Sequence, residues 1–165
     1  MSLRTGGQVA ITTGAIINPN NLKIEGFYCQ DMANKKKQLV LVYQDIRDVI
    51  AKGIVVNDQE VLVEPDELVR LKDLMNLKFE LMGKPVVTVS KERLGKVNDY
   101  AAETTTMFVQ KLYVGQSLLK SLTGGSLSVD RTQIVEITNR KIVIQDILQG
   151  ISAIAPASAP AAPAS

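Results

Sequence analysis

The side chains that could carry out catalysis are few, because the 165 residues include no histidine and a single cysteine, Cys29. Without histidine, the chain cannot form a Ser–His or Cys–His nucleophile pair or a histidine-ligated metal site, and one cysteine cannot supply a thiolate zinc cluster within a chain. The remaining acid–base candidates are two pairs of carboxylates close in sequence, Asp45 with Asp48 and Asp58 with Glu60. Acids near predicted turns are commonly solvated, and a two-carboxylate site also needs a cleft. The chain is therefore predicted not to be an enzyme.

The glycines do not follow a phosphate-binding pattern. Gly124 and Gly125 lack the Lys-Ser/Thr that follows the glycines of a P-loop, and no GxGxxG sequence follows a predicted strand. Turns that need a positive φ explain such glycines. The sequence therefore predicts no cofactor.

The only basic run is Lys35, Lys36 and Lys37, and it is the candidate nucleic-acid contact of the chain. It precedes the most apolar segment, where a lysine cluster also discourages edge-to-edge strand pairing. Stacking on bases requires exposed rings beside the charge, and only Phe27 or Tyr28 is placed to supply one. The formal net charge of +2 adds little, because phosphate neutralisation favours a strongly basic face. A solvated loop and an RNA contact both remain open for this run.

Cysteine usage and hydropathy indicate the compartment. A lone cysteine excludes an intrachain disulfide, and Cys29 lies in a strand-like segment, where a thiol usually behaves as a small buried apolar group. No apolar run is long enough to span a bilayer, and the N-terminus lacks the apolar core of a signal peptide. These features predict a cytoplasmic protein.

The elements that would position these side chains are mostly short strands. In the first half, strands are predicted over 9–11, 22–31, 39–43, 54–56 and 60–63, with a loop over 14–21, a hairpin turn over 32–37 and a short helical or extended segment over 45–51. Residues 22–31 alternate, whereas 39–43 are apolar on both faces and should be covered on both sides. In the second half, strands are predicted over 86–89, 95–100, 106–114, 127–129, 133–137 and 141–144.

A linker helix is predicted near the middle of the chain, where Pro65 precedes two acids. The helix would run to about Leu77, or a last strand would run into it, and its apolar stripe would pack on a barrel. That stripe consists of Leu68, Leu71, Leu74 and Met75. A partner-binding helix is the alternative for this segment.

Two stretches about seventy residues apart resemble each other and indicate a duplicated small domain. Val42-Tyr43 is aligned with Leu112-Tyr113, and Ile24-Glu25-Gly26-Phe27 with Leu94-Gly95-Lys96-Val97. The predicted fold class is mainly β, with two tandem small β-barrels. The domains are 1–76 with the linker, 77–150, and an Ala/Pro-rich tail over 151–165 that is expected to be disordered.

The repeat unit resembles the PRC-barrel, a small β-barrel shared by the photosynthetic reaction-centre H subunit and the ribosome-maturation factor RimM. The resemblance is clearest over residues 81–87, 94–99, 108–114 and the closing hairpin 134–144. It implies a non-enzymatic adaptor that binds another protein, with an RNA- or ribosome-associated maturation factor as the alternative. It transfers no catalytic residues, and it does not identify the partner or the oligomeric state.

Overall fold

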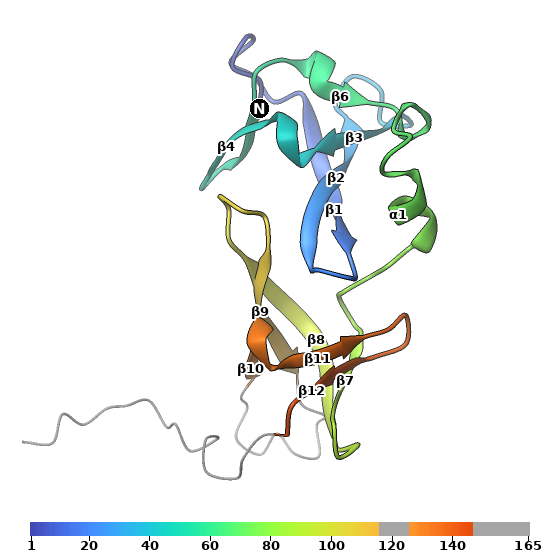
Figure 1. The fold of residues 1–165 in the computed structure, drawn as a ribbon. Helices are drawn as coiled ribbons and strands as arrows, with labels where there is room; N and C mark the ends of the chain where they lie inside the picture. The colour runs from blue at the N-terminus through green and yellow to red at the C-terminus, as the bar shows by residue number, and fades with distance from the viewer. Residues whose placement is uncertain (116–125, 147–165) are drawn as a thin grey trace, which may run out of the picture.

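A computed structural model describes residues 1–115 and 126–146. The described chain is mainly β, as predicted (Figure 1). Its first half contains β1 (Ala10–Asn18), β2 (Lys23–Asp31), β3 (Gln38–Val42), η1 (Tyr43–Asp45), β4 (Ile46–Ile50), β5 (Gly53–Val56), η2 (Gln59–Val61), β6 (Leu62–Val63), η3 (Pro65–Glu67) and α1 (Lys72–Leu77). Its second half contains β7 (Pro85–Thr88), β8 (Arg93–Ala102), β9 (Val109–Gly115), β10 (Ser126–Asp130), η4 (Arg131–Gln133), β11 (Ile134–Ile137) and β12 (Ile142–Ile144).

The strands form open sheets. One sheet has the order β1-β2-β3-β6, a second has the order β10-β9-β8-β7-β12-β11, and β4 pairs with β5 alone. No closed barrel is found among the described residues, so the two predicted barrels are not confirmed. The predicted tail over 151–165 lies outside the described residues. Within the described ranges, no helix is both long and apolar enough to cross a membrane.

Strand β3 has both faces covered, as its continuous apolar run predicted. Leu39 and Leu41 pack in one apolar cluster with Cys29, whereas Val40 packs on the opposite face with Leu71. Successive side chains of a strand point to opposite faces, so this run needs an apolar layer on each side. The leucine stripe of the linker supplies the second layer and packs on β3, but the barrel on which it was predicted to pack is not confirmed.

Three predicted elements differ in extent from the observed ones. The loop predicted over 14–21 is largely strand, because β1 pairs with β2 from Ala10 to Asn18. Residues 45–51 are mainly extended, as β4. The predicted linker helix is interrupted: a short 3₁₀ turn (η3) is separated from α1, and α1 ends at Leu77, where the following Lys78 has a φ of 46°.

The two halves repeat each other strand by strand, but in a different register from the one that the sequence suggested. Adding 85 to the residue numbers of the β1–β2 ladder from Ile11–Gln30 to Ile17–Ile24 reproduces the β8–β9 ladder, including both register shifts. The pair Thr12–Cys29, for example, corresponds to Val97–Val114. The alignment seventy residues apart is therefore wrong, because it matched short apolar runs rather than the positions of the bulges.

The correspondence continues through the next three strands with a spacing of 88. Ile46 pairs with Val56 in the β4–β5 hairpin, and Ile134 pairs with Ile144 in the β11–β12 hairpin. A register shift follows Ile46 in the first hairpin and Ile134 in the second. The same spacing relates β3 to β10 and η1 to η4. We call residues 1–63 the first unit and residues 80–146 the second unit.

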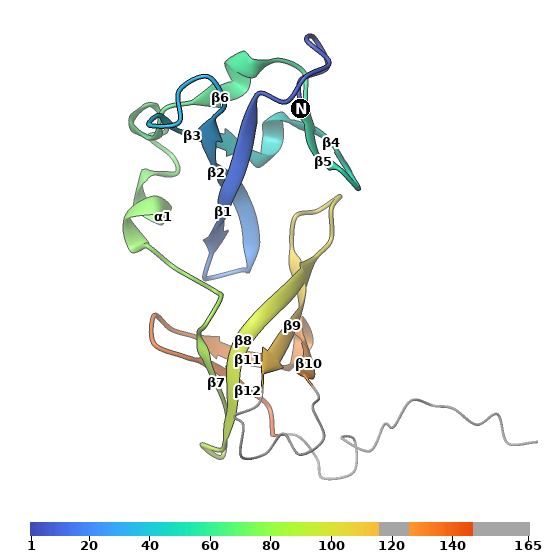
Figure 2. The ribbon, with the colours of Figure 1, turned by 180° about the vertical axis from the view of Figure 1, so that it is seen from behind.

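The two units contact each other reciprocally through their first hairpins. The amide of Ile24 donates to Met107 O, and the amide of Val109 donates to Leu22 O, in both cases over less than 3 Å. Lys23 forms an isolated antiparallel bridge with Phe108, its own counterpart in the second unit. Figures 1 and 2 show the β1–β2 and β8–β9 hairpins side by side and pointing in opposite directions. The units therefore meet as two copies around a twofold axis would, with each copy offering the same surface.

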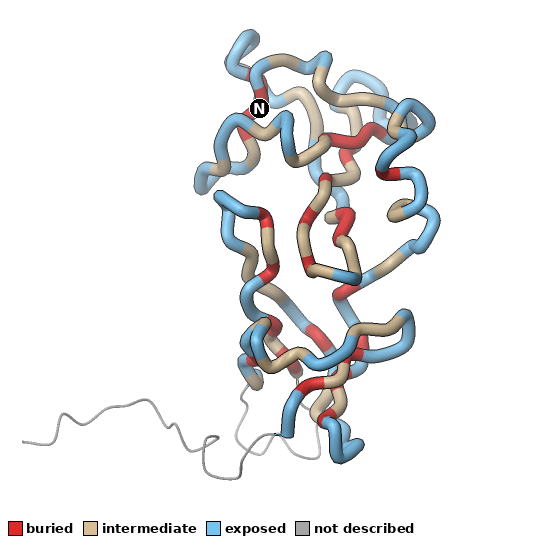
Figure 3. Tube along the Cα trace, in the orientation of Figure 1, coloured by how far each residue is buried: buried red, intermediate tan, exposed pale blue. Residues whose placement is uncertain are grey.

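This interface shares one apolar core between the units. The largest buried cluster includes Leu22 and Ile24 of the first unit together with Leu112, Ile142 and Ile144 of the second. Figure 3 shows buried residues along both hairpins where they meet. Leu22 and Met107 adopt φ values of 56° and 60°, a region that is costly for residues with a side chain. Both side chains are buried in this cluster, and their burial offsets that cost.

Candidate functional site

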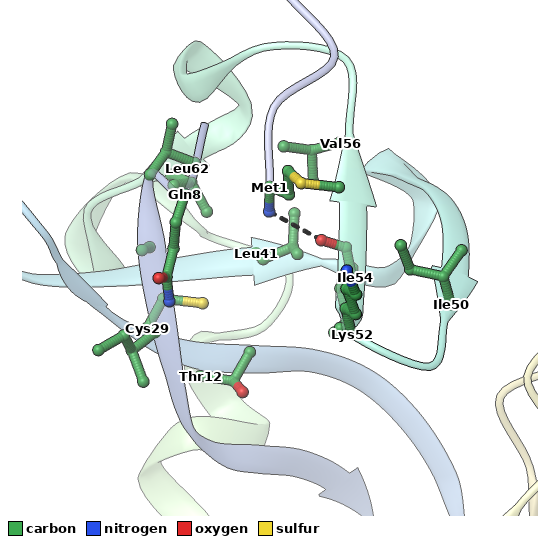
Figure 4. A pocket seen from close by; sticks show the side chains of 14 residues that line it. Met1, Gln8, Thr12, Cys29, Leu41, Ile50, Lys52, Ile54, Val56 and Leu62 are labelled. Atoms are coloured by element: carbon green, nitrogen blue, oxygen red, sulfur yellow. Dashed lines mark hydrogen bonds between the residues drawn. The ribbon is translucent and has the colours of Figure 1, made fainter. Parts of the chain in front are cut away.

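A cavity of about 290 Å³ opens in the first unit, between the N-terminal residues, β1 and β5. Fourteen residues line it, and most of them are apolar. Figure 4 shows Leu41, Ile54 and Val56 around this space, with the Met1 ammonium donating to Ile54 O at 2.9 Å. We call this space the first-unit cavity. It is a candidate binding site because an apolar space of this size is normally filled in a packed core.

The second unit shows what fills the equivalent space there. The counterparts of Cys29, Leu41 and Val56 are Val114, Val129 and Ile144, which are all almost fully buried. They pack in one cluster with Leu81 and Val86, which lie in the segment that enters β7. We call residues 80–86 the core segment. In the first unit, Ser2 bridges to Val56 as Thr88 pairs with Ile144 in the second.

The mouth of the first-unit cavity carries exposed aliphatic side chains. Met1, Ile11 and Ile50 line it and have exposed fractions of 43%, 45% and 38%. Large apolar side chains exposed together, rather than singly, indicate an interaction site. The cavity and its rim thus form a single apolar surface.

Charge at this surface is sparse. Lys52 is the only charged side chain among the lining residues. Its counterpart in the second unit, Arg140, lines a shallow depression together with Glu80 at the start of the core segment. The second unit therefore sets an acidic residue near the position that corresponds to Lys52.

Cys29 lies in the wall of the first-unit cavity, as part of β2. It is a free thiol with an exposed fraction of 2%, and its burial raises its pKa above the ordinary value. A buried thiol with a raised pKa is a poor nucleophile, because the thiolate is the reactive form. Its structural role matches the prediction of a small buried apolar group.

The candidate nucleic-acid run lies on the loop between β2 and β3, and all three of its lysines are exposed. Lys37 Nζ lies 2.7 Å from Glu64 Oε1, and this contact raises the pKa of Lys37. The backbone of Lys35 accepts a hydrogen bond from Gln30 Nε2, and the amide of Lys36 donates to Asn34 Oδ1. One of the three charges is thus partly neutralised within the molecule.

Two of the four carboxylates noted in the sequence accept hydrogen bonds from backbone amides near their own turns. Asp48 accepts from the amide of Val49, and Asp58 accepts from the amide of Gln59. Asp58 also pairs with Arg4, and these contacts lower the pKa of its carboxyl group. Within the part of the chain that the structure describes, no group of three or more potential acidic, cysteine or histidine ligands is arranged to hold a metal ion.

Sequence inspection did not identify the first-unit cavity. The usable signal was the polar Thr12 at the place that Val97 holds in the second unit, but it becomes visible only after the spacing of 85 is known. A comparison with known family models and with curated protein sequences found no match to this chain.

Proposed function

We propose that this chain is a non-enzymatic adaptor, a protein-interaction module built from two PRC-barrel-like units. The observation that carries the proposal is the apolar first-unit cavity, with the exposed aliphatic side chains of Met1, Ile11 and Ile50 at its mouth. An open apolar surface of this kind is suited to binding another protein.

The strand order supports the PRC-barrel-like assignment of both units. The second unit runs β10-β9-β8-β7-β12-β11. In the first unit, β3-β2-β1 and β5-β4 correspond to the two ends of this order but lie in separate sheets, and Ser2 bridges to Val56 of β5 as β7 pairs with β12. The order and the duplication are the features on which the family resemblance depends.

Site-specific photo-crosslinking in cells tests the adaptor proposal. A photoreactive side chain at position 11, at the mouth of the first-unit cavity, should capture a defined protein. The matched control is position 89, because Val89 is an exposed apolar residue (55%) of the second unit. The captured protein should then bind the purified chain directly and lose binding in an Ile11→Asp variant. Equal capture at both positions, or no direct binding, would contradict the proposal.

The alternative, an RNA- or ribosome-associated factor, would use Lys35, Lys36 and Lys37. The pairing of Lys37 with Glu64 favours the adaptor over this alternative, because it leaves less positive charge for phosphate. Nuclease treatment before crosslinking separates the two: a capture that requires RNA would support the alternative.

A further inference from the structure

We infer that a depression of the second unit binds a dianionic phosphoryl group, the group that free phosphate and phosphate monoesters share. The depression lies between the chain that enters β7 and the β11–β12 turn, and it has a volume of about 300 Å³. Its lining includes three cationic side chains, Lys78, Lys84 and Arg140, and one acidic side chain, Glu80. We call it the anion site. It is separate from the first-unit cavity, so its failure would leave the adaptor proposal standing.

Parallel pairing of β7 with β12 brings the cationic side chains together. Val86 pairs with Ile142, so the residues that precede these two strands also lie side by side. Lys84 Nζ accordingly donates to Asn139 O at 2.9 Å, next to Arg140. Figure 1 shows the chain that enters β7 passing beside the β11–β12 hairpin. The anion site thus joins two segments that are far apart in sequence and that the sheet fixes relative to each other.

Lys84 is held in place on both sides of its backbone. Its amide donates to Leu81 O at 3.3 Å, and its carbonyl oxygen accepts from the amide of Val97 at 3.0 Å. The residue is only 8% exposed, and Nζ lies 4.7 Å from the centroid of the Phe79 ring. A side chain that is already fixed loses little conformational entropy when it binds a ligand.

The ammonium group of Lys84 has hydrogen-bonding capacity left for an anion. It carries three N–H donors, and one of them bonds to Asn139 O. Within residues 1–115 and 126–146, none of the three cationic side chains of the site forms an ion pair. Burial lowers the pKa of Lys84, because it disfavours the charged ammonium, and the carboxylate of Glu80 opposes this effect. A bound anion would stabilise the ammonium form.

The charge of the lining favours a dianion. Three cationic side chains and one carboxylate leave two formal positive charges at the site. A phosphate monoester carries about −1.5 to −2 charges at pH 7 and three acceptor oxygens. A carboxylate or a phosphodiester has a single negative charge and fewer charged acceptor oxygens. The dianion therefore matches both the charge of the site and the number of its cationic groups.

The test is an NMR titration of the full, isotope-labelled chain at constant ionic strength, with inorganic phosphate and with capped phosphoserine. We expect saturable shifts of the amides of Gly83, Lys84 and Asn139. The pKa of Lys84, followed through its Cε resonance, should rise on binding because the anion stabilises the ammonium. Tighter binding of phosphoserine would support a modified protein as the source of the phosphoryl group, and equal or tighter binding of phosphate would support the free ion.

Matched variants locate the site. Lys84→Met keeps the apolar stem and should weaken phosphate binding at least about tenfold. Arg140→Gln changes an exposed residue and should weaken binding about threefold. Glu80→Gln removes the competing carboxylate and should tighten binding by about the same factor. Lys111→Gln removes an exposed charge of β9 outside the site and should leave binding unchanged.

Circular dichroism of each variant checks the fold. If Lys84→Met does not fold, the opposite effects of Arg140→Gln and Glu80→Gln still decide, because a purely structural role would not produce them. Three outcomes would overturn the inference. They are no saturable binding in the millimolar range, equal weakening by Lys111→Gln, and binding of acetate or dimethyl phosphate as tight as that of phosphate.

Discussion

Replacing Leu22 by alanine tests whether the two units fold as one body. The Leu22 side chain is 3% exposed and belongs to the cluster that contains Leu112 and Ile142 of the second unit. Truncating a buried leucine to alanine costs about 2–5 kcal/mol, and the tight reciprocal contact places this site near 3 kcal/mol. That loss is a large fraction of the stability of a typical domain. Met107→Ala, at the equivalent position, should have a similar effect.

The assay is chemical denaturation followed by circular dichroism, combined with hydrogen exchange resolved by mass spectrometry. If the units share their stability, Leu22→Ala should speed amide exchange in β9 and β12 of the second unit as well as in β2 of the first. Exchange of core strands reports global unfolding, so both units should lose protection by a similar factor.

A matched control separates shared stability from local damage. Leu71 is 8% exposed and packs with Ile16 and Val40, and all three lie outside the second unit. Leu71→Ala should destabilise the chain without a preferential loss of amide protection at the interface between the units. The reasoning is refuted if Leu22→Ala speeds exchange in the first unit while β9 and β12 retain the protection of the unaltered chain.

Three further predictions follow from individual contacts. Burial raises the pKa of Cys29, so the rate of its alkylation by iodoacetamide should reach half of its maximum at a higher pH than that of a free thiol, and denaturant should remove the difference. The pKa of Asp146 is lowered by its hydrogen bonds to Ser90, and that of Asp58 by Arg4. Stability from both carboxylates is therefore present at pH values above their unfolded pKa of about 3.9, and it is lost as the pH falls through the lower folded pKa. Asp146→Asn and Asp58→Asn should each reduce the dependence of the unfolding midpoint on acidic pH. Filter binding at low salt should show no retention of RNA by the unaltered chain, because Lys37 is paired with Glu64; retention that changing the exposed run 35–37 to glutamine abolishes would support the RNA alternative.

Much of the fold was predictable from local patterns. The alternation over 22–31 and the apolar run over 39–43 predicted β2 and β3, and the loop predicted over 14–21 contains the turn between β1 and β2. The extent of β1 was missed because Gly14 and Ala15 have a weak strand preference, which pairing with β2 overrides.

The register of the duplication could not be predicted from the sequence. Equivalent positions hold dissimilar residues: Lys23 corresponds to Phe108, and Tyr43 corresponds to Arg131. In each unit, however, a cation lies over an aromatic ring. Lys23 Nζ lies 3.8 Å from the centroid of the Tyr43 ring, and Arg131 Cζ lies 4.6 Å from the centroid of the Phe108 ring. A cation and a ring have exchanged places between the two units. The contact is maintained while the sequence similarity is lost, so a search for matching residues cannot find it.

The same comparison of equivalent positions distinguishes the interface between the units from the first-unit cavity. At the interface, both residues of the cation–ring contact differ between the units, yet the contact is present in each unit. This indicates that the shared core constrains both copies. At the cavity, Leu41, Ile54 and Val56 line open space, whereas their counterparts Val129, Ile142 and Ile144 are packed in the shared core. Unfilled apolar space forfeits packing energy, so these walls gain stability only when an apolar group packs against them. The adaptor function proposed above supplies such a group from a partner protein, and the common core gives the walls rigid support.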